Sequence, residues 1–345
     1  MKKSTNKPLC LLLALLIVLS LSVSVCQAAT TGQAAEAAKI TVTDQAGREV
    51  TINGLPDRIV SGYYISSSTC IALGLTDRMV GIEAKADIRP IYALAAQKLL
   101  KLPNVGTAKE FNLEACVALE PDLVILPKRL RDSADMLAEL GIPAILVNPE
   151  NHRDLVEMIT LIGRSTGAED KAAMLVGYYN GELAAVAELT KGISERPSVY
   201  MAGYSGYLST APKDMYQASL IDAAGGVNAA RGVDGDNWTS VSYEQVIAMN
   251  PDVIVIPAEA SYAKGDILKD AQLADIAAVK EGKIYKMPND FEAWDMPVPS
   301  CTLGIRWMLN ALHGDVYPLK ALQGDAASFY SKFYGVEIDA ALIGK

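Results

Sequence analysis

Two matching segments lie 130 residues apart in this chain of 345 residues. The first is Asn112-Leu-Glu-Ala-Cys-Val-Ala-Leu-Glu-Pro-Asp-Leu-Val-Ile-Leu-Pro127, and the second is Ser242-Tyr-Glu-Gln-Val-Ile-Ala-Met-Asn-Pro-Asp-Val-Ile-Val-Ile-Pro257. Each predicts an amphipathic helix with Asn or Ser as N-cap, which Pro-Asp ends before a buried apolar strand. The spacing indicates two similar lobes, because solenoid repeats recur every ~20–50 residues.

Outside the repeat, short apolar runs alternate with helical patterns. A hairpin is predicted at 40–43 and 49–52, and further strands at 58–61, 79–82, 122–126, 144–147, 198–204, 253–256 and 283–286. Helices are predicted at 67–73, 113–119, 132–140, 153–165, 216–223, 243–249, 271–279, 302–312 and 326–333. This alternation is typical of a mostly parallel sheet with helices on both faces, so we predict two doubly wound α/β lobes.

One helical pattern, Glu169–Lys191, is longer than the others and contains no proline before Gly192. At about 35 Å it is longer than a crossover helix usually needs, so we interpret it as the single connection between lobes with a ligand cleft between them. An ordinary crossover within one large sheet is the alternative. The predicted organisation is a signal peptide at 1–28, a flexible tether at 29–39, an N-terminal lobe at 40–167, the connecting helix at 168–192, and a C-terminal lobe with C-terminal helices at 193–345.

The N-terminus has the three parts of a secretory signal. Lys2, Lys3 and Lys7 precede the apolar run Leu9–Val25, and Cys26-Gln27-Ala28 offers small residues for cleavage. A transmembrane anchor is the alternative, although the run is borderline in length for a bilayer core of ~30 Å. We therefore predict export to the periplasm or the cell surface, either as a lipoprotein anchored at Cys26 or as a soluble form cleaved after Ala28.

Composition excludes some classes of protein. Without the first 28 residues the chain has 28 basic and 40 acidic residues, which argues against binding nucleic acid. Cys70, Cys116 and Cys301 are widely spaced and are expected in the core rather than in a disulfide or zinc site. We interpret His152 and His313 as helix caps and predict no metal site formed by the protein itself.

The paired segments resemble the family of iron-siderophore, heme and vitamin B12 periplasmic binding proteins, the class III receptors of ABC importers. The similarity extends from about Ile40 to about Leu312. The resemblance implies that Glu114 and Glu244 dock the receptor onto arginines of the permease dimer, one acid on each lobe. The alternative is that each acid only stabilises its helix dipole.

Ligands of open α/β sheets bind beyond the carboxyl ends of the strands, so the candidate ligand residues are those that follow the predicted strands. They are aromatic or cationic: Tyr63, Tyr64, Arg89, Tyr92, Lys128, Arg129, Tyr204, Tyr207, Trp238 and Trp294. The resemblance also places an aromatic residue at Trp238 in the cleft. We expect Trp238 and Trp294 to face each other there, because rings and guanidinium groups suit a flat anionic ligand. Packing within a lobe is the alternative for the rings, and a solvated loop for the cations.

The sequence thus predicts a receptor rather than an enzyme, with no catalytic residues and no cofactor of its own. It would bind a ferric siderophore, heme or corrinoid, so that the ligand carries iron or cobalt. The first alternative is the same receptor with a small oxyanion such as molybdate or tungstate, and the second is a chelatase-like enzyme, since fold alone does not fix function. We expect a monomer that works with an ABC importer permease.

Overall fold

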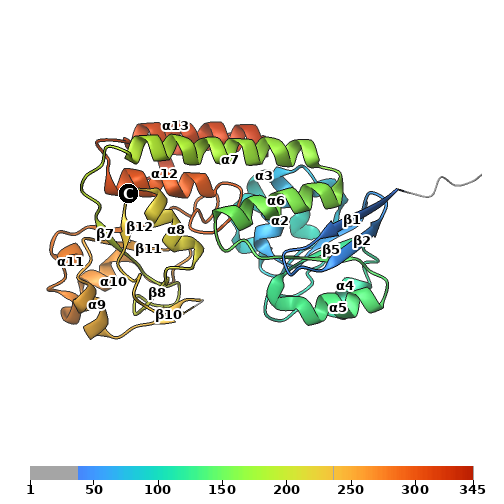
Figure 1. The fold of residues 1–345 in the computed structure, drawn as a ribbon, viewed down its shortest axis with the longest axis horizontal. Helices are drawn as coiled ribbons and strands as arrows, with labels where there is room; N and C mark the ends of the chain where they lie inside the picture. Colours follow the sequence, from blue (N-terminus) through green and yellow to red (C-terminus); the bar gives the residue numbers. More distant parts are fainter. Residues whose placement is uncertain (1–37, 236, 345) are drawn as a thin grey trace, which may run out of the picture. The chain divides into compact units, whose positions relative to one another are not determined.

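Two four-stranded parallel sheets organise the chain in the computed structural model, which describes residues 38–235 and 237–344 (Figure 1). The predicted signal peptide lies outside the described residues, as does the predicted tether except for its last two positions. Lys39, assigned to that tether, is instead the first residue of strand β1. No described helix is both long and apolar enough to cross a membrane.

The first sheet has the order β4-β3-β5-β6, and its strands are β3 Ile59–Ser61, β4 Met79–Gly81, β5 Leu123–Pro127 and β6 Ala144–Val147. Strands β3, β5 and β6 are buried along their whole length, as expected for a parallel sheet with helices on both faces. The helices of this lobe are α2 Tyr64–Ala72, α3 Pro90–Ala95, α4 Leu113–Val117, α5 Arg131–Glu139 and α6 His152–Thr166.

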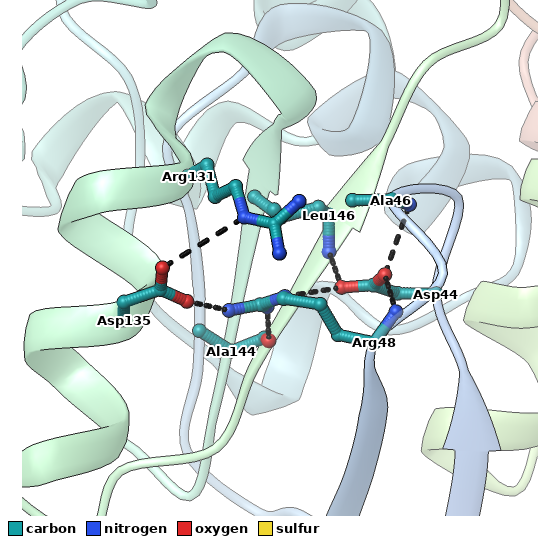
Figure 2. A network of polar contacts seen from close by, with 7 residues as sticks. All are labelled: Asp44, Ala46, Arg48, Arg131, Asp135, Ala144 and Leu146. Atoms are coloured by element: carbon teal, nitrogen blue, oxygen red, sulfur yellow. Dashed lines mark hydrogen bonds and ion pairs between the residues drawn. The ribbon is translucent and has the colours of Figure 1, made fainter.

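A hairpin of β1 Lys39–Thr43 and β2 Glu49–Asn53 joins this lobe through the turn between its strands. The Asp44 carboxylate accepts hydrogen bonds from the backbone N–H groups of Arg48 (2.9 Å) and Leu146 (3.1 Å), the latter in β6. Arg48 in turn donates to Asp135 of α5 at 2.8 Å (Figure 2). This network fixes the hairpin against the edge of the sheet.

The second sheet has the order β12-β11-β7-β9, with β7 Ser198–Met201, β9 Val227–Asn228, β11 Val253–Ile256 and β12 Ile284–Lys286. A separate pair is formed by β8 Ser209–Thr210 and β10 Thr239–Ser240. The helices of this lobe are α8 Tyr216–Ala223, α9 Tyr243–Met249, α10 Lys264–Leu268, α11 Ala277–Lys280, α12 Cys301–Leu312 and α13 Leu319–Phe329, which continues as a π-helix over Tyr330–Tyr334.

Three details of the second lobe correct the sequence prediction. Strand β9 was not predicted, because two residues give no detectable alternation. The predicted helix at 271–279 is a 3₁₀ turn, Ala271–Leu273, followed by α11, because Ile276 is extended between them. Strand β7 ends at Met201 rather than at Tyr204.

Helix α7, Glu169–Thr190, connects the two lobes, and this confirms the predicted fold class (Figure 1). It packs against α6 and α12, and Tyr178 on it contacts Phe329 and Phe333 near the C-terminus, with ring centroids 5.5 and 5.1 Å away. Arg306 of α12 forms ion pairs with Glu182 of α7 and with Asp325, at 3.1 Å in the second pair. The connecting helix is therefore supported by α6 of the first lobe and by α12 and the C-terminal helix of the second lobe.

Candidate functional site

Loops from the two lobes meet at an ion pair. Arg89 follows β4 in the first lobe, and its Nη1 atom lies 2.6 Å from Oε1 of Glu259, which follows β11 in the second lobe. The Arg89 guanidinium carbon also lies 3.5 Å from the centre of the Tyr64 ring, a cation–π contact. We call the surroundings of this pair the interlobe site.

A buried carboxylate supports the first-lobe side of the interlobe site. Glu83, which is 5% exposed, accepts hydrogen bonds from Ser67 at 2.5 Å and from the Tyr92 hydroxyl. Burial raises the pKa of Glu83. Tyr92 itself is fully buried, and its hydroxyl binds Glu83. The prediction that Tyr92 faces the ligand is therefore wrong.

A second buried carboxylate, Glu292, joins the lobes. It follows β12 in the second lobe and accepts hydrogen bonds from Ser68 of α2 in the first lobe, from Ser300, and from the Tyr334 hydroxyl at 2.9 Å. Burial raises its pKa as well. The contact between the lobes is therefore polar and internally satisfied, because hydroxyl groups donate to a carboxylate that water does not reach.

A third buried carboxylate positions the aromatic groups of the second lobe. Asp295 accepts a hydrogen bond from the Tyr204 hydroxyl at 2.7 Å and one from the Ala258 N–H at 3.3 Å. Burial raises the pKa of Asp295 to about 6. Trp238, which is half-buried, packs edge-on against Tyr204 with ring centroids 5.0 Å apart. This Tyr204–Trp238 pair is near the ion pair, since Asp295 binds both the Tyr204 hydroxyl and the N–H of Ala258, the residue before Glu259. Burial raises the pKa of Tyr204.

Trp294 corrects the prediction that two tryptophans face each other. Its side chain is fully buried, and its indole N–H donates to the Tyr330 hydroxyl at 3.0 Å. Gly304 of α12 permits this packing, because a Cβ atom there would lie 2.2 Å from the Trp294 carbonyl oxygen. Trp294 is a core residue, and the aromatic partner of Trp238 is Tyr204.

The other predicted ligand residues have different settings. Lys128 and Arg129 are exposed at the end of β5, whereas the nearby Arg131 pairs with Asp135 at 3.8 Å. Tyr63 is half-buried, and its carbonyl oxygen accepts a hydrogen bond from Ser66 at 2.8 Å. Tyr207 donates to Asp270 at 2.8 Å, so its hydroxyl is already occupied.

Sequence reasoning missed Glu259 and Glu83. For Glu259 a signal was present in the repeat, because it follows Pro257 at the position where Arg129 follows Pro127. It also lies just beyond the carboxyl end of β11, a loop of the kind that carries ligand residues.

The two predicted docking acids open matching helices. Asn112 caps α4 by accepting from the Ala115 N–H at 3.0 Å, and Ser242 and Gln245 form a capping box on α9. Glu114 and Glu244 are both exposed in the first turn. A hydrogen bond from Ser242 lowers the pKa of Glu244, which is therefore ionised at neutral pH. Both carboxylates are available to a partner, and docking itself stays a prediction.

The cysteines and histidines serve the interior. Cys70, Cys116 and Cys301 are free and buried, as predicted, and burial raises the pKa of each thiol to about 12. His152 contacts the Tyr179 hydroxyl and does not cap its helix, since the N-cap of α6 is Asn151. His313 follows α12, with Nε2 3.3 Å from the Gly225 carbonyl oxygen. Within 38–235 and 237–344, no three His, Cys, Asp or Glu residues are grouped to hold a metal ion.

Comparisons with known proteins agree with this architecture. Residues 59–291 match the family model described as "Periplasmic binding protein". The uncharacterized ABC transporter substrate-binding lipoprotein YvrC of Bacillus subtilis is 29% identical over 83% of this chain and 89% of its own. The cobalamin-binding protein of Halobacterium salinarum is 28% identical over 79% of this chain and 74% of its own.

The molybdate-binding protein MolA of Haemophilus influenzae is also similar, at 26% identity over 85% of this chain and 90% of its own. Its molybdate-bound structure superposes on this one with a TM-score of 0.77, covering 87% of this chain and 99% of that one. The structural alignment has 24% identity, so it supports the fold and not a shared ligand.

Proposed function

The chain belongs to the periplasmic binding protein family, and from this premise we propose that it captures a metal chelate outside the cytoplasm and delivers it to the permease of an ABC importer. The receptor role rests on the family match and on relatives that are substrate-binding proteins of such transporters. The ligand class rests on the chemistry of the interlobe site.

The observation that carries the ligand class is the combination of two half-buried rings with a guanidinium group that lies over a third, buried ring. Tyr204 and Trp238 form an aromatic pair on the second lobe, and Arg89 lies over Tyr64 on the first. Aromatic faces bind flat, apolar ring systems, and a guanidinium group binds carboxylate or catecholate oxygens. A chelate such as heme, a corrinoid or a ferric siderophore offers flat or polar faces of these kinds.

A small oxyanion is the second candidate. It is favoured by the likeness to the molybdate-binding protein and by Arg89, whose planar fork suits an oxyanion. On this reading Lys128 and Arg129, which are exposed at the end of β5, would add positive charge.

Delivery would use the exposed acids. We propose that Glu114 on α4 and Glu244 on α9 contact cationic groups of the permease, since an ionised carboxylate forms its strongest hydrogen bonds with arginine. The secretory pattern at 1–28 and the lipoprotein relative support an extracytoplasmic, membrane-attached receptor with Cys26 as the attachment point.

The ligand class can be tested on protein purified from the native host. A visible absorbance band together with iron or cobalt in the same sample would support a chelate. A colourless sample that contains molybdenum would support the oxyanion. Titration of ligand-free protein with hemin, cyanocobalamin, ferric citrate and molybdate, followed by tryptophan fluorescence, then measures affinity directly. Failure to bind any of these four would contradict both candidates.

A further inference from the structure

The ion pair between Arg89 and Glu259 occupies the position where the proposed ligand would be held. The two side chains are 17% and 24% exposed, so the pair is shielded but still reachable from solvent. Arg89 has its flat face on the Tyr64 ring, which leaves the edge of the guanidinium group for hydrogen bonding. Glu259 is bound at that edge, with 2.6 Å between the two atoms.

Glu259 differs from the other carboxylates around the interlobe site. Glu83, Glu292 and Asp295 are at most 5% exposed, and hydroxyl or N–H groups of the protein satisfy them. Within the described part of the chain, by contrast, the carboxylate of Glu259 forms no hydrogen bond or ion pair except the one to Arg89. The first three carboxylates hold the structure together, whereas Glu259 can leave its partner without disrupting a network.

We propose that Glu259 is an internal competitor of the ligand: its carboxylate competes with the anionic group of the ligand for Arg89. When the ligand binds, one of its anionic oxygens replaces the Glu259 carboxylate on Arg89. This inference rests on the proposed function, because it assumes that a ligand binds between the lobes. It adds that the ligand carries a carboxylate, catecholate or oxyanion group, and that Glu259 determines specificity.

The exchange has a physical rationale. Arg89 is already held on Tyr64 and already partly desolvated, so an incoming anion meets a preorganised guanidinium group. An uncharged ligand cannot compensate for the separation of Arg89 from Glu259, because removing one partner of a shielded pair leaves a charge unpaired. Only an anion that binds the guanidinium edge more strongly than the Glu259 carboxylate can therefore replace it there, whereas an uncharged ligand leaves the ion pair in place.

The test compares Glu259→Gln, Arg89→Gln and the double variant with the wild-type protein, using hemin and molybdate as anionic probes and cyanocobalamin as a probe without carboxylates. Glu281→Gln is the matched control, since Glu281 also pairs with a cation, Lys283 at 2.7 Å, in a different part of the second lobe. Thermal unfolding of each variant checks that it is folded.

We expect Glu259→Gln to lower the Kd of the anionic probe that binds by about tenfold, the scale of one charge-pair coupling. The Kd of cyanocobalamin should fall by less than about twofold, because this probe has no carboxylate to bind the guanidinium edge. Arg89→Gln should weaken anion binding, and in that background Glu259→Gln should give no gain. A lower Kd for hemin would identify the anion as part of a chelate, and a lower Kd for molybdate would identify it as a free oxyanion.

Two results overturn the competitor while leaving the proposed function intact. One is an unchanged Kd in Glu259→Gln for a probe whose binding Trp238→Ala weakens. The other is a gain that persists when Arg89 is replaced or that also appears in Glu281→Gln, which would reduce the effect to overall charge. If the wild-type protein binds none of the probes, the proposed function fails and the competitor fails with it.

Discussion

The strand-end loops of the two lobes carry different charged residues although the lobes share one plan. The first lobe places Arg89, Lys128 and Arg129 beyond its strands, and the second places Glu259, Glu292 and Asp295 beyond its own. Repeated positions even exchange sign, since Arg129 and Glu259 follow equivalent prolines. The helix-strand unit that builds the lobes is thus retained, whereas the loops that follow it differ, because loops bear little of the packing.

Helices α4 and α9, which carry the two predicted docking acids, are instead alike in the two lobes. Helices α4 and α9 keep an N-cap, an exposed acid two positions later and a buried residue at the fourth position, Cys116 or Val246. A surface that contacts a two-fold symmetric partner needs the same group on both lobes, whereas a site that binds one asymmetric ligand needs different groups.

The largest expected effect separates Trp238 from Trp294, the two tryptophans that lie in strand-end loops of the second lobe. Trp294→Ala should lower the free energy of unfolding by about 3–5 kcal/mol, because it empties a fully buried site and leaves the Tyr330 hydroxyl without its indole partner. Denaturant unfolding measures this, with Trp238→Ala as the control. Equal losses in the two variants would show that both rings belong to the core.

The second prediction concerns the exposed acid that both lobes carry in the first turn of α4 and α9. Glu114→Ala with Glu244→Ala should weaken the complex with the permease by about 3 kcal/mol, if each charge-assisted contact contributes ~1.5 kcal/mol and the two sites act independently. Ligand affinity and stability should be almost unchanged, since both side chains are exposed.

Uptake by reconstituted permease, at receptor concentrations near the docking Kd, measures this effect. Glu139→Ala, which removes an exposed acid from α5, is the control. Full transport by the double variant would show that the two acids only stabilise their helices.

The acids of the second lobe predict a pH dependence. The folded pKa of Asp295, about 6, lies above its ordinary value of 3.8, so its contribution to stability is fully present below the unfolded pKa and is lost as pH rises through the folded pKa. Between pH 4 and pH 7, the free energy of unfolding of Asp295→Asn should therefore rise by about 2–3 kcal/mol relative to that of the wild-type protein.

Urea unfolding at several pH values measures this change, and the exposed Asp290→Asn is the control. A difference between Asp295→Asn and the wild-type protein that stays constant with pH would mean that Asp295 is ionised in the folded state throughout this range.

The smallest effect concerns the aromatic pair. Trp238→Ala should weaken ligand binding by about 1–3 kcal/mol, the scale of a desolvated aromatic anchor, with little change in unfolding. Isothermal titration measures it, and Tyr207→Phe is the control because that hydroxyl is bound to Asp270. Affinity that holds while stability falls would reassign the ring to lobe packing.

Local features of the chain were enough to predict the framework of this protein. The repeat at Asn112 and Ser242 predicted two lobes, and the unbroken pattern from Glu169 predicted the connecting helix, because helix periodicity, caps and Pro-Asp stops are local features. The same local reasoning placed the three cysteines in the core, since an apolar segment predicts burial without any knowledge of neighbours.

The role of each strand-end residue depends instead on contacts between distant parts of the chain. Trp238 and Trp294 both lie in strand-end loops. Trp294 is buried against Gly304 and Tyr330, whereas Trp238 packs against Tyr204 and stays half-exposed. Arg89 and Glu259 are 170 positions apart and meet through the juxtaposition of two lobes. No local pattern encodes such a pairing, because the energy of a side chain between lobes depends on partners that folding brings together from distant parts of the chain.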